Sequence, residues 1–126
     1  MAPQNPNPEI ETKRVPNDQL EAYFASFTKH FLLRESTNAI DVEVLSTDWG
    51  DQLAARGAHL YGITYDPKGN ALEFELEGGD HRVYKPKEVW TAEAGDGFVN
   101  AIEVVRDDGT REIARVNRLG IAPADS

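Results

Sequence analysis

The central stretch HLYGITYDPKGNALEFELEGGDHRVYK constrains the fold most, because two turn signals flank one short run of alternating apolar and acidic residues. Residues 67–70 suit a four-residue loop, since Pro67 favours the first position of a type I turn and Gly69 tolerates a positive φ. The strand pairs that this loop predicts are Tyr65 with Leu72, Ile63 with Phe74, and Tyr61 with Leu76. All six side chains then lie on one face of a hairpin.

The second turn signal is the Gly78-Gly79 pair, which suits a two-residue hairpin turn. The pairs that it predicts are Leu76 with His81, Phe74 with Val83, and Glu75 with Arg82, with Tyr84 directed outward opposite Glu73. Both hairpins place Phe74 and Leu76 on the same face, whereas a slip of one residue in either turn would reverse that face. The sequence therefore predicts a three-stranded antiparallel meander.

A helix is predicted to precede the meander. Asn17 is a suitable N-cap after Pro16, and the helical pattern ends near residue 33. One face of this helix carries Leu20, Phe24, Phe27 and Phe31 at spacings of four, three and four residues. Such a stripe is typical of core packing, and the lining of a ligand groove is its alternative use.

Further strands are predicted on both sides of the meander. Residues 39–46 (AIDVEVLS) alternate apolar and acidic residues, and residues 88–93 (EVWTAE) form a short strand after Pro86, which interrupts pairing. After a turn at GDG, residues 98–119 predict a hairpin around Asp108-Gly109. A two-residue turn there would set Arg106 opposite Arg111, so a longer or bulged turn is the alternative. Residues 47–57 are compatible with a helical turn or a short strand.

The expected fold is α+β and mainly β, in a single domain of residues 16–119. In this fold an N-terminal amphipathic helix packs on a strongly bent antiparallel sheet or small barrel of five to seven strands, Sm-like or SH3-like by analogy. The prolines at positions 3, 6, 8 and 16 and their polar neighbours predict a disordered tail over residues 1–15. Residues 120–126 are predicted to form a short C-terminal tail.

The charge balance restricts the partners. The chain has 126 residues, of which 22 are acidic and 13 are basic, and its net charge is −9. Phosphate backbones and anionic membranes repel such a chain, so we expect neither nucleic acid nor membrane as a partner. The absence of cysteine excludes disulfides and a cysteine nucleophile. We expect a cytoplasmic protein, a monomer or weak homodimer, with an unknown protein partner.

Motifs for catalysis or metal binding are not found in the sequence. His30, His59 and His81 are dispersed, and no serine lies in a nucleophile motif or beside a recognisable base. We therefore predict no catalytic residue, no metal ligand and no cofactor. His81 is expected to be a partly buried structural residue that bonds the backbone or a carboxylate.

The candidate binding residues are charged and aromatic side chains on strands or at strand ends. They are Arg82, Tyr84, Glu73, Glu75, Trp49 and Trp90. Exposed Tyr, Trp and Arg side chains are typical anchors of protein interfaces. The preferred alternative is core packing for the two tryptophans and a solvated outer face for the glutamates.

Three segments carry a resemblance to a known family. They are LYGITYDPKGNALEFEL, HRVYKPKEVW and IEVVRDDGTREIARV. With the aromatic helix before them, they resemble a family of small bacterial proteins catalogued as a domain of unknown function, over most of residues 16–118. The shared pattern is a Gly-Ile pair followed by Asp, a His-x-hydrophobic-x-x-Pro segment and a final Asp-Gly hairpin. The resemblance implies no activity, so it assigns no role to any residue.

Three kinds of function are compatible with these features. A protein-interaction or regulatory module that acts through a sheet face or an open edge strand is ranked first. A ligand-binding domain with a pocket between helix and sheet is the alternative. An enzyme is ranked last, because the sequence holds no recognisable nucleophile or metal motif.

Overall fold

The computed structural model describes residues 10–33, 40–46 and 52–118. The strands are β1 (Glu11–Val15), β2 (Ile40–Ser46), β3 (Gln52–Asp66), β4 (Ala71–Leu76), β5 (His81–Tyr84), β6 (Pro86–Glu93), β7 (Val99–Arg106) and β8 (Arg111–Arg118). Between β1 and β2 the chain forms a 3₁₀ turn (Asn17–Gln19), the helix α1 (Leu20–Phe27) and a π-helical turn (Thr28–Leu32). The described part is thus mainly β with one helical stretch, as predicted.

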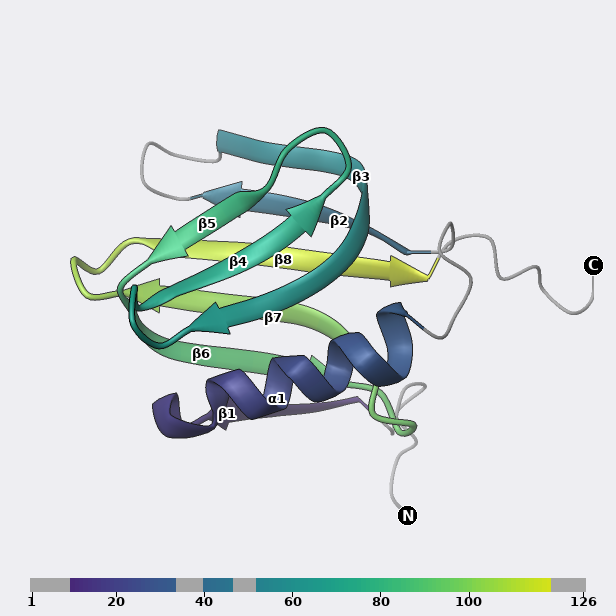
Figure 1. The fold of residues 1–126 in the computed structure, drawn as a ribbon, viewed down its shortest axis with the longest axis horizontal. Coiled ribbons are helices and arrows are strands. Elements are labelled where there is room, and N and C mark those ends of the chain that lie inside the picture. Colours follow the sequence, from purple (N-terminus) through teal and green to yellow (C-terminus); the bar gives the residue numbers. More distant parts are fainter. Residues whose placement is uncertain (1–9, 34–39, 47–51, 119–126) are drawn as a thin grey trace, which may run out of the picture.

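The long strand β3 divides the sheet into two layers. The strands are hydrogen-bonded in the order β1-β6-β7-β8-β2-β3-β4-β5. The first half of β3 pairs with β2, and its second half, residues 60–66, pairs with β4. In Figure 1, β3 curves from a back layer of β1, β6, β7, β8 and β2 to a front layer that holds β4 and β5 beside α1. The predicted strong bend of an antiparallel sheet is confirmed.

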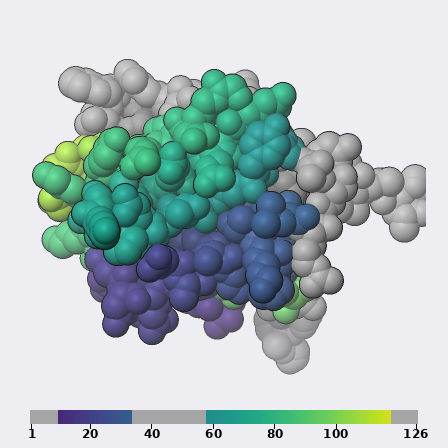
Figure 2. Space-filling view, in the orientation of Figure 1, coloured from purple at the N-terminus to yellow at the C-terminus, as the bar shows by residue number. Residues whose placement is uncertain are grey.

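The small barrel that the sequence analysis offers as an alternative is not formed. Among the described strands, β1 and β5 end the order at opposite edges and do not pair with each other. Within the described residues the sheet has eight strands, more than the five to seven expected. Figure 2 shows the helical stretch lying directly against the β3–β4 part of the front layer. The helix therefore covers one side of the opening between the layers, where a closed barrel would have another strand.

The core lies between the two layers and the helix. It includes Leu20, Phe24, Phe27 and Leu32 from the helical stretch, Leu60, Ile63, Leu72, Phe74 and Val83 from the front layer, and Val89, Val99, Ile102, Val104, Ala114 and Val116 from the back layer. Burial of this apolar surface is the main force that holds the layers together.

The first hairpin of the meander has the predicted register near its turn. The observed pairs include Tyr65 with Leu72 and Ile63 with Phe74. The register then shifts between Leu60 and Gly62, and Leu60 lies opposite Leu76. The predicted pairing of Tyr61 with Leu76 is therefore wrong. The bulge adds one residue and leaves Tyr61 47% exposed, while Leu60 enters the core.

The second hairpin lies two residues away from its predicted register. The observed pairs are Ala71 with Tyr84, Leu72 with Val83, Glu73 with Arg82, and Phe74 with His81. The Gly78-Gly79 pair belongs to a longer turn, in which the Asp80 carboxylate accepts a hydrogen bond from the Leu76 amide at 3.2 Å. The predicted two-residue turn is wrong, because the Leu76 amide bonds the Asp80 side chain and Leu76 does not pair with His81. A shift of two residues preserves the faces, so Val83 is buried as predicted.

The helix is confirmed over the predicted range, but its ends differ. Asn17 is not the N-cap; Pro16 precedes the first helical residue, and no side chain caps it. The final turn is π-helical and therefore holds one residue more than an α-helical turn. The buried residue after Phe27 is consequently Leu32, five positions later. Phe31, predicted on the core stripe, is only partly buried and packs against the core from its edge.

Residues 11–15 form β1, although the sequence analysis places them in a disordered tail. β1 pairs with β6 from Glu11 opposite Glu93 to Val15 opposite Val89. Val15 is 2% exposed and is the only buried residue of the strand. The polar run before Val15 therefore gives no hydrophobic signal of a strand, which explains the error. The predicted tails of residues 1–9 and 120–126 lie outside the described residues.

The remaining strands resolve the alternatives left open. Residues 52–57 belong to β3, so the strand interpretation is correct for them, while residues 47–51 are not described. The last hairpin has the longer turn, with Val105 opposite Arg111. Pro86 does not interrupt pairing; it begins β6 and pairs with Arg106. The chain changes direction one residue earlier, at Lys85, which has a φ of 55°.

Candidate functional site

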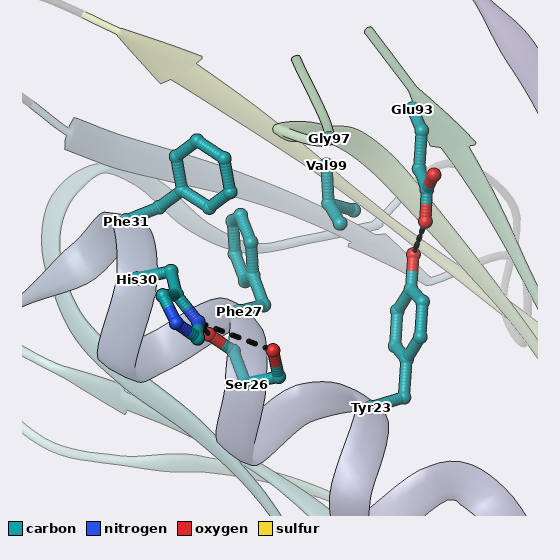
Figure 3. Close-up of a pocket in the computed structure, with 8 residues that line it drawn as sticks. All are labelled: Tyr23, Ser26, Phe27, His30, Phe31, Glu93, Gly97 and Val99. Carbon is teal, nitrogen blue, oxygen red and sulfur yellow. Dashed lines mark hydrogen bonds between the residues drawn. The ribbon is translucent and has the colours of Figure 1, made fainter. Parts of the chain in front are cut away.

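A hollow of about 230 Å³ opens between the helix and the hairpin of β6 and β7. Its lining residues are Tyr23, Ser26, Phe27, His30, Phe31, Glu93, Gly97 and Val99. Figure 3 shows the two phenylalanines on one side and the Tyr23–Glu93 pair on the other, with His30 and Ser26 along the helix. Apolar walls and a few polar groups thus converge on one concave site, which is the usual composition of a ligand pocket.

The polar wall is built around Glu93. The Tyr23 hydroxyl donates to the Glu93 carboxylate and lies 3.1 Å from Thr91 Oγ1. Lys13 Nζ on β1 lies 3.1 Å from the same carboxylate oxygen and 5.3 Å from the centre of the Tyr23 ring. Burial, together with the adjacent Glu93 charge, raises the pKa of Tyr23. The Tyr23 hydroxyl is therefore a fixed hydrogen-bond donor at neutral pH.

The contact between His30 and Ser26 fixes the tautomer of the imidazole. His30 Nδ1 lies 2.9 Å from the Ser26 carbonyl oxygen and 3.2 Å from Ser26 Oγ. A carbonyl oxygen only accepts hydrogen bonds, so the Nδ1 that bonds it carries the hydrogen. The same nitrogen then does not accept the Ser26 proton, and this contact does not activate a serine nucleophile. In the neutral ring, Nε2 remains as an acceptor.

Aromatic rings form the opposite wall. The centroids of Phe27 and Phe31 lie 5.5 Å apart, and each ring also packs near the edge of Phe98. Gly97 closes the turn before β7 with a φ of 95°, and a side chain there would meet the Phe31 ring at 3.8 Å. The hollow is therefore bounded by rigid aromatic groups on a helix and a tight turn, and its shape is preorganised.

A second candidate surface is the outer face of the back layer, which is turned away from the viewer in Figure 1. The core residues of β6, β7 and β8 alternate with outward residues that form cross-strand rows. One row is Arg14, Trp90, Glu103 and Ile113; the next is Thr12, Ala92, Ala101 and Arg115; a third is Glu88, Val105 and Arg111. A shallow hollow of about 260 Å³ lies over the small residues of the middle row, beside Trp90 and Ile113.

Trp90 is thus on the outer face of the sheet and does not belong to the core cluster. The preferred alternative of core packing is wrong for this residue, because strand alternation directs Val89 and Thr91 inward. The Trp90 indole N–H donates to Glu88 Oε1 at 3.1 Å, which holds the ring along the sheet. Trp49, the other tryptophan among the candidates, lies outside the described residues.

The candidates on β4 and β5 lie on the outer face of the front layer. Arg82 Nη2 lies 3.3 Å from Glu73 Oε1, so its ion-pair partner is Glu73 and not the predicted Glu75. Glu75 instead accepts a hydrogen bond from the Thr64 hydroxyl at 3.1 Å. Tyr84 is 50% exposed at the end of β5. The structure therefore places four of the six candidates on one sheet face, and it pairs Arg82 with Glu73 in an ion pair typical of a solvated sheet face.

His81 is the structural residue that the sequence analysis expects. Its Nε2 lies 2.7 Å from Oε1 of Glu112, whose side chain is 8% exposed. Arg106 Nη1 lies 3.5 Å from the other oxygen of the same carboxylate. This cluster joins β5 to β7 and β8 at the end of the molecule where the front and back layers meet.

The polar residues of the hollow beneath the helix, between α1 and the β6–β7 hairpin, are not predictable from local sequence patterns. Tyr23 and Glu93 are separated by 70 positions, and Lys13 lies on a strand that carries no hydrophobic pattern. The alternation of Thr91 and Glu93 with Trp90 and Ala92 does indicate two polar side chains on the inner face of β6. That signal does not identify the element that meets them. Within the described part of the chain, no group of three or more metal-ligating side chains is found.

Comparisons with known proteins place the chain among relatives whose role is not known. The sequence pattern of DUF5335, a family of unknown function, matches residues 11–124, which confirms the resemblance noted from the sequence. An uncharacterised protein of Aquifex aeolicus is 38% identical over 108 residues, which cover 85% of this chain and 93% of that protein. No solved structure matches. In the described residues, no helix is long and apolar enough to cross a membrane.

Proposed function

We propose that this chain, which belongs to the DUF5335 family of unknown function, is a protein-interaction module. The surface that we assign to the interaction is the outer face of β6, β7 and β8, with Trp90 at its centre. The proposed setting is the cytoplasm, which the absence of cysteine fits.

The observation that carries this proposal is the composition of the outer face. Outward positions of a solvated antiparallel sheet are usually polar. Here Trp90, Ala92, Ala101, Val105 and Ile113 occupy such positions. Tryptophan and arginine are among the side chains that most often supply binding energy in protein interfaces, and this face carries Trp90 and several arginines. The hollow over Ala92 and Ala101 gives a partner's side chain a place to insert beside Trp90.

The charge of the face indicates the chemistry of the partner. Three arginines (Arg14, Arg111 and Arg115) lie among its rows against two glutamates (Glu88 and Glu103), in a chain whose net charge is −9. The rows on β1, β6, β7 and β8 therefore carry a small positive excess on an acidic protein, although Glu43 on β2 lies opposite Arg115 in the strand register. Complementary charge steers association and suppresses wrong partners. We accordingly infer a partner surface that presents an apolar side chain surrounded by carboxylates.

Affinity capture from a lysate of the native host, with variants matched in kind, tests this proposal. Trp90→Ala and Arg14→Glu change the outer face, while Tyr84→Ala and Lys68→Glu are the corresponding changes on exposed residues of the front layer. We expect one partner to be retained by the wild type and both controls. Trp90→Ala should abolish its retention, and Arg14→Glu should weaken it by about tenfold in a titration with the purified partner. Retention that is insensitive to Trp90 and Arg14 would refute the assignment.

A ligand-binding role is the second candidate function, and the hollow beneath the helix supports it. Binding is favoured over catalysis there because His30 uses its Nδ1 hydrogen on the Ser26 carbonyl and does not activate the Ser26 hydroxyl. The hollow is also smaller than the usual range of about 300–1,000 Å³ for drug-sized ligands, which limits it to small molecules.

A further inference from the structure

We propose that the hollow beneath the helix binds a small, flat organic cation, such as an aromatic amine or amidine. This inference concerns a different surface from the proposed protein interface and does not depend on it. It rests on three properties of the lining residues: their hydrogen-bonding character, the aromatic wall and the position of Lys13.

The groups that line the hollow are mainly hydrogen-bond acceptors. The Glu93 side chain is 17% exposed, and its Oε2 is the oxygen that accepts from both the Tyr23 hydroxyl and the Lys13 ammonium. His30 donates through Nδ1 to the Ser26 carbonyl, and in the neutral ring its Nε2 is an acceptor. A ligand that satisfies a carboxylate and an imidazole nitrogen must itself donate hydrogen bonds. A positively charged donor makes the stronger bond to the carboxylate.

The aromatic wall favours a flat cation over an aliphatic one. Phe27 and Phe31 present their rings from the helix, and Gly97 leaves space beside the Phe31 ring. A planar body packs against such rings with little loss of conformational freedom, and the ring faces attract a cation. The size of the hollow limits the ligand to roughly a single ring with one charged group.

Lys13 shows that the Tyr23–Glu93 pair accommodates a cation. Its ammonium lies 3.1 Å from Glu93 Oε2 and 5.3 Å from the centre of the Tyr23 ring. Lys13 is not among the residues that line the hollow, and its side chain is 45% exposed. A ligand cation would therefore share the carboxylate with Lys13, and the two positive charges would compete for it. Removal of the lysine charge should consequently strengthen ligand binding.

Benzamidine is a suitable probe, with benzoate as its anionic counterpart of similar shape. Titration of the full-length protein, followed by amide NMR signals, should show saturable shifts at Gly97, Val99 and His30 with benzamidine, and none at Gly78. For a ligand of this size we expect a dissociation constant on the order of 1 mM. Glu93→Gln keeps an acceptor for Tyr23 but removes the charge, and it should weaken binding by about tenfold or more.

Two further variants separate the carboxylate contact from general effects on the fold. Lys13→Met should strengthen benzamidine binding several-fold, in the opposite direction to Glu93→Gln. Glu77→Gln, at an exposed position in the turn after β4, should leave it unchanged. Equal binding of benzoate, shifts that are not confined to the hollow, or no saturation up to about 10 mM benzamidine would each overturn the proposal. The proposal would also be overturned if Lys13→Met and Glu93→Gln changed the affinity for benzamidine in the same direction.

Discussion

Folding alters the ionisation of Tyr23. Its pKa is raised above the ordinary value of about 10 by burial and by the Glu93 carboxylate, which accepts a hydrogen bond from the Tyr23 hydroxyl. A raised pKa means that the folded state retains the proton longer than the unfolded chain. The stabilisation is therefore fully present below about pH 10 and is lost as the pH rises above that value.

We predict that the free energy of unfolding falls above about pH 10 by up to about 1.4 kcal/mol per pH unit from this single group. Tyr23→Phe should flatten that part of the curve, whereas Tyr84→Phe, at an exposed position, should not. Denaturant titrations at several alkaline pH values measure the slopes. Equal slopes for the wild type and Tyr23→Phe would show that Tyr23 is not the group responsible.

The three consecutive residues His81, Arg82 and Val83 are predicted to differ in their contributions to stability. Val83 is 1% exposed, so Val83→Ala should cost about 1–3 kcal/mol. Arg82 forms an exposed pair with Glu73 across the strands, so Arg82→Ala should change stability by no more than about 0.5 kcal/mol. His81→Ala should cost about as much as the valine change, because it removes the closer partner of the buried Glu112. Denaturant melts rank the variants, and a neutral Val83→Ala with a damaging Arg82→Ala would contradict the observed faces.

At the scale of elements, the Thr28 side chain bonds the helical stretch to the backbone of β3. Thr28 Oγ1 donates to the Ile63 carbonyl and accepts from the Ile63 amide, both at 3.0 Å. These backbone groups point away from β4, since β4 pairs with the other side of β3. Thr28 therefore supplies the hydrogen bonds that a neighbouring strand would otherwise make. Thr28 begins the π-helical turn, and the helix comes close to Gly62 at this point. A Cβ atom at position 62 would lie 3.3 Å from Thr28 Cγ2.

We predict that Thr28→Val destabilises the protein by about 1–3 kcal/mol, because it leaves two backbone groups of a buried residue without partners. Thr28→Ser keeps the hydroxyl and should cost less. Thr64→Val is the matched control, since its hydroxyl bonds Glu75 on an exposed face, and it should stay within about 0.5 kcal/mol. Hydrogen exchange at the Ile63 amide should quicken only in Thr28→Val. Unchanged exchange there would mean that the contact is not formed in solution.

At the scale of the whole molecule, β1 completes the back layer. It pairs with β6 along residues 11–15 and supplies Val15 to the core and Lys13 to Glu93. Deletion of residues 1–15 is therefore expected to destabilise the fold by several kcal/mol, whereas deletion of residues 1–9, a proline-rich polar segment, should have little effect. Thermal melts of the two truncated chains give the comparison. If the longer deletion were harmless, the pairing of β1 with β6 would not matter for stability.

The two sheet edges bear on the oligomeric state. β1 and β5 end the order of strands, and an unpaired edge can bind a second chain. β5 has only four residues and β1 carries charged residues on most of its length, which both oppose edge-to-edge pairing. We predict a monomer or weak homodimer, which sedimentation at low micromolar concentration measures. A tight dimer would contradict this expectation.

The family to which the chain belongs constrains its architecture more than its role. The sequence pattern of the family covers residues 11–124 and therefore includes β1, which the sequence analysis placed in a tail. The relative from Aquifex aeolicus likewise covers most of both chains. The functional proposals made here rest on the side chains of this protein alone, and the benzamidine and Trp90 experiments test them separately.

The sequence by itself determined local features of this protein: the helix, the meander with the inward face of most of its residues, and the presence of the last hairpin. Those features depend on turn residues and on periods of two or 3.6 residues, which act over a few neighbours along the chain. Three local features were not predicted, because no sequence pattern indicates them. The bulge at Tyr61, the Asp80 hydrogen bond and the π-helical turn each add residues where the periodicity alone is compatible with either register.

Only the tertiary structure decided which distant residues meet. The contact of Tyr23 with Glu93, the Thr28 bond to Ile63 and the outward position of Trp90 all depend on how the two layers and the helix pack. Residues 11–15 form the strand β1 because their backbone pairs with the edge of β6, although Val15 is the only one of the five that is buried. Packing between distant elements is chosen by the total apolar area that the whole chain buries, and no short stretch of sequence carries that information.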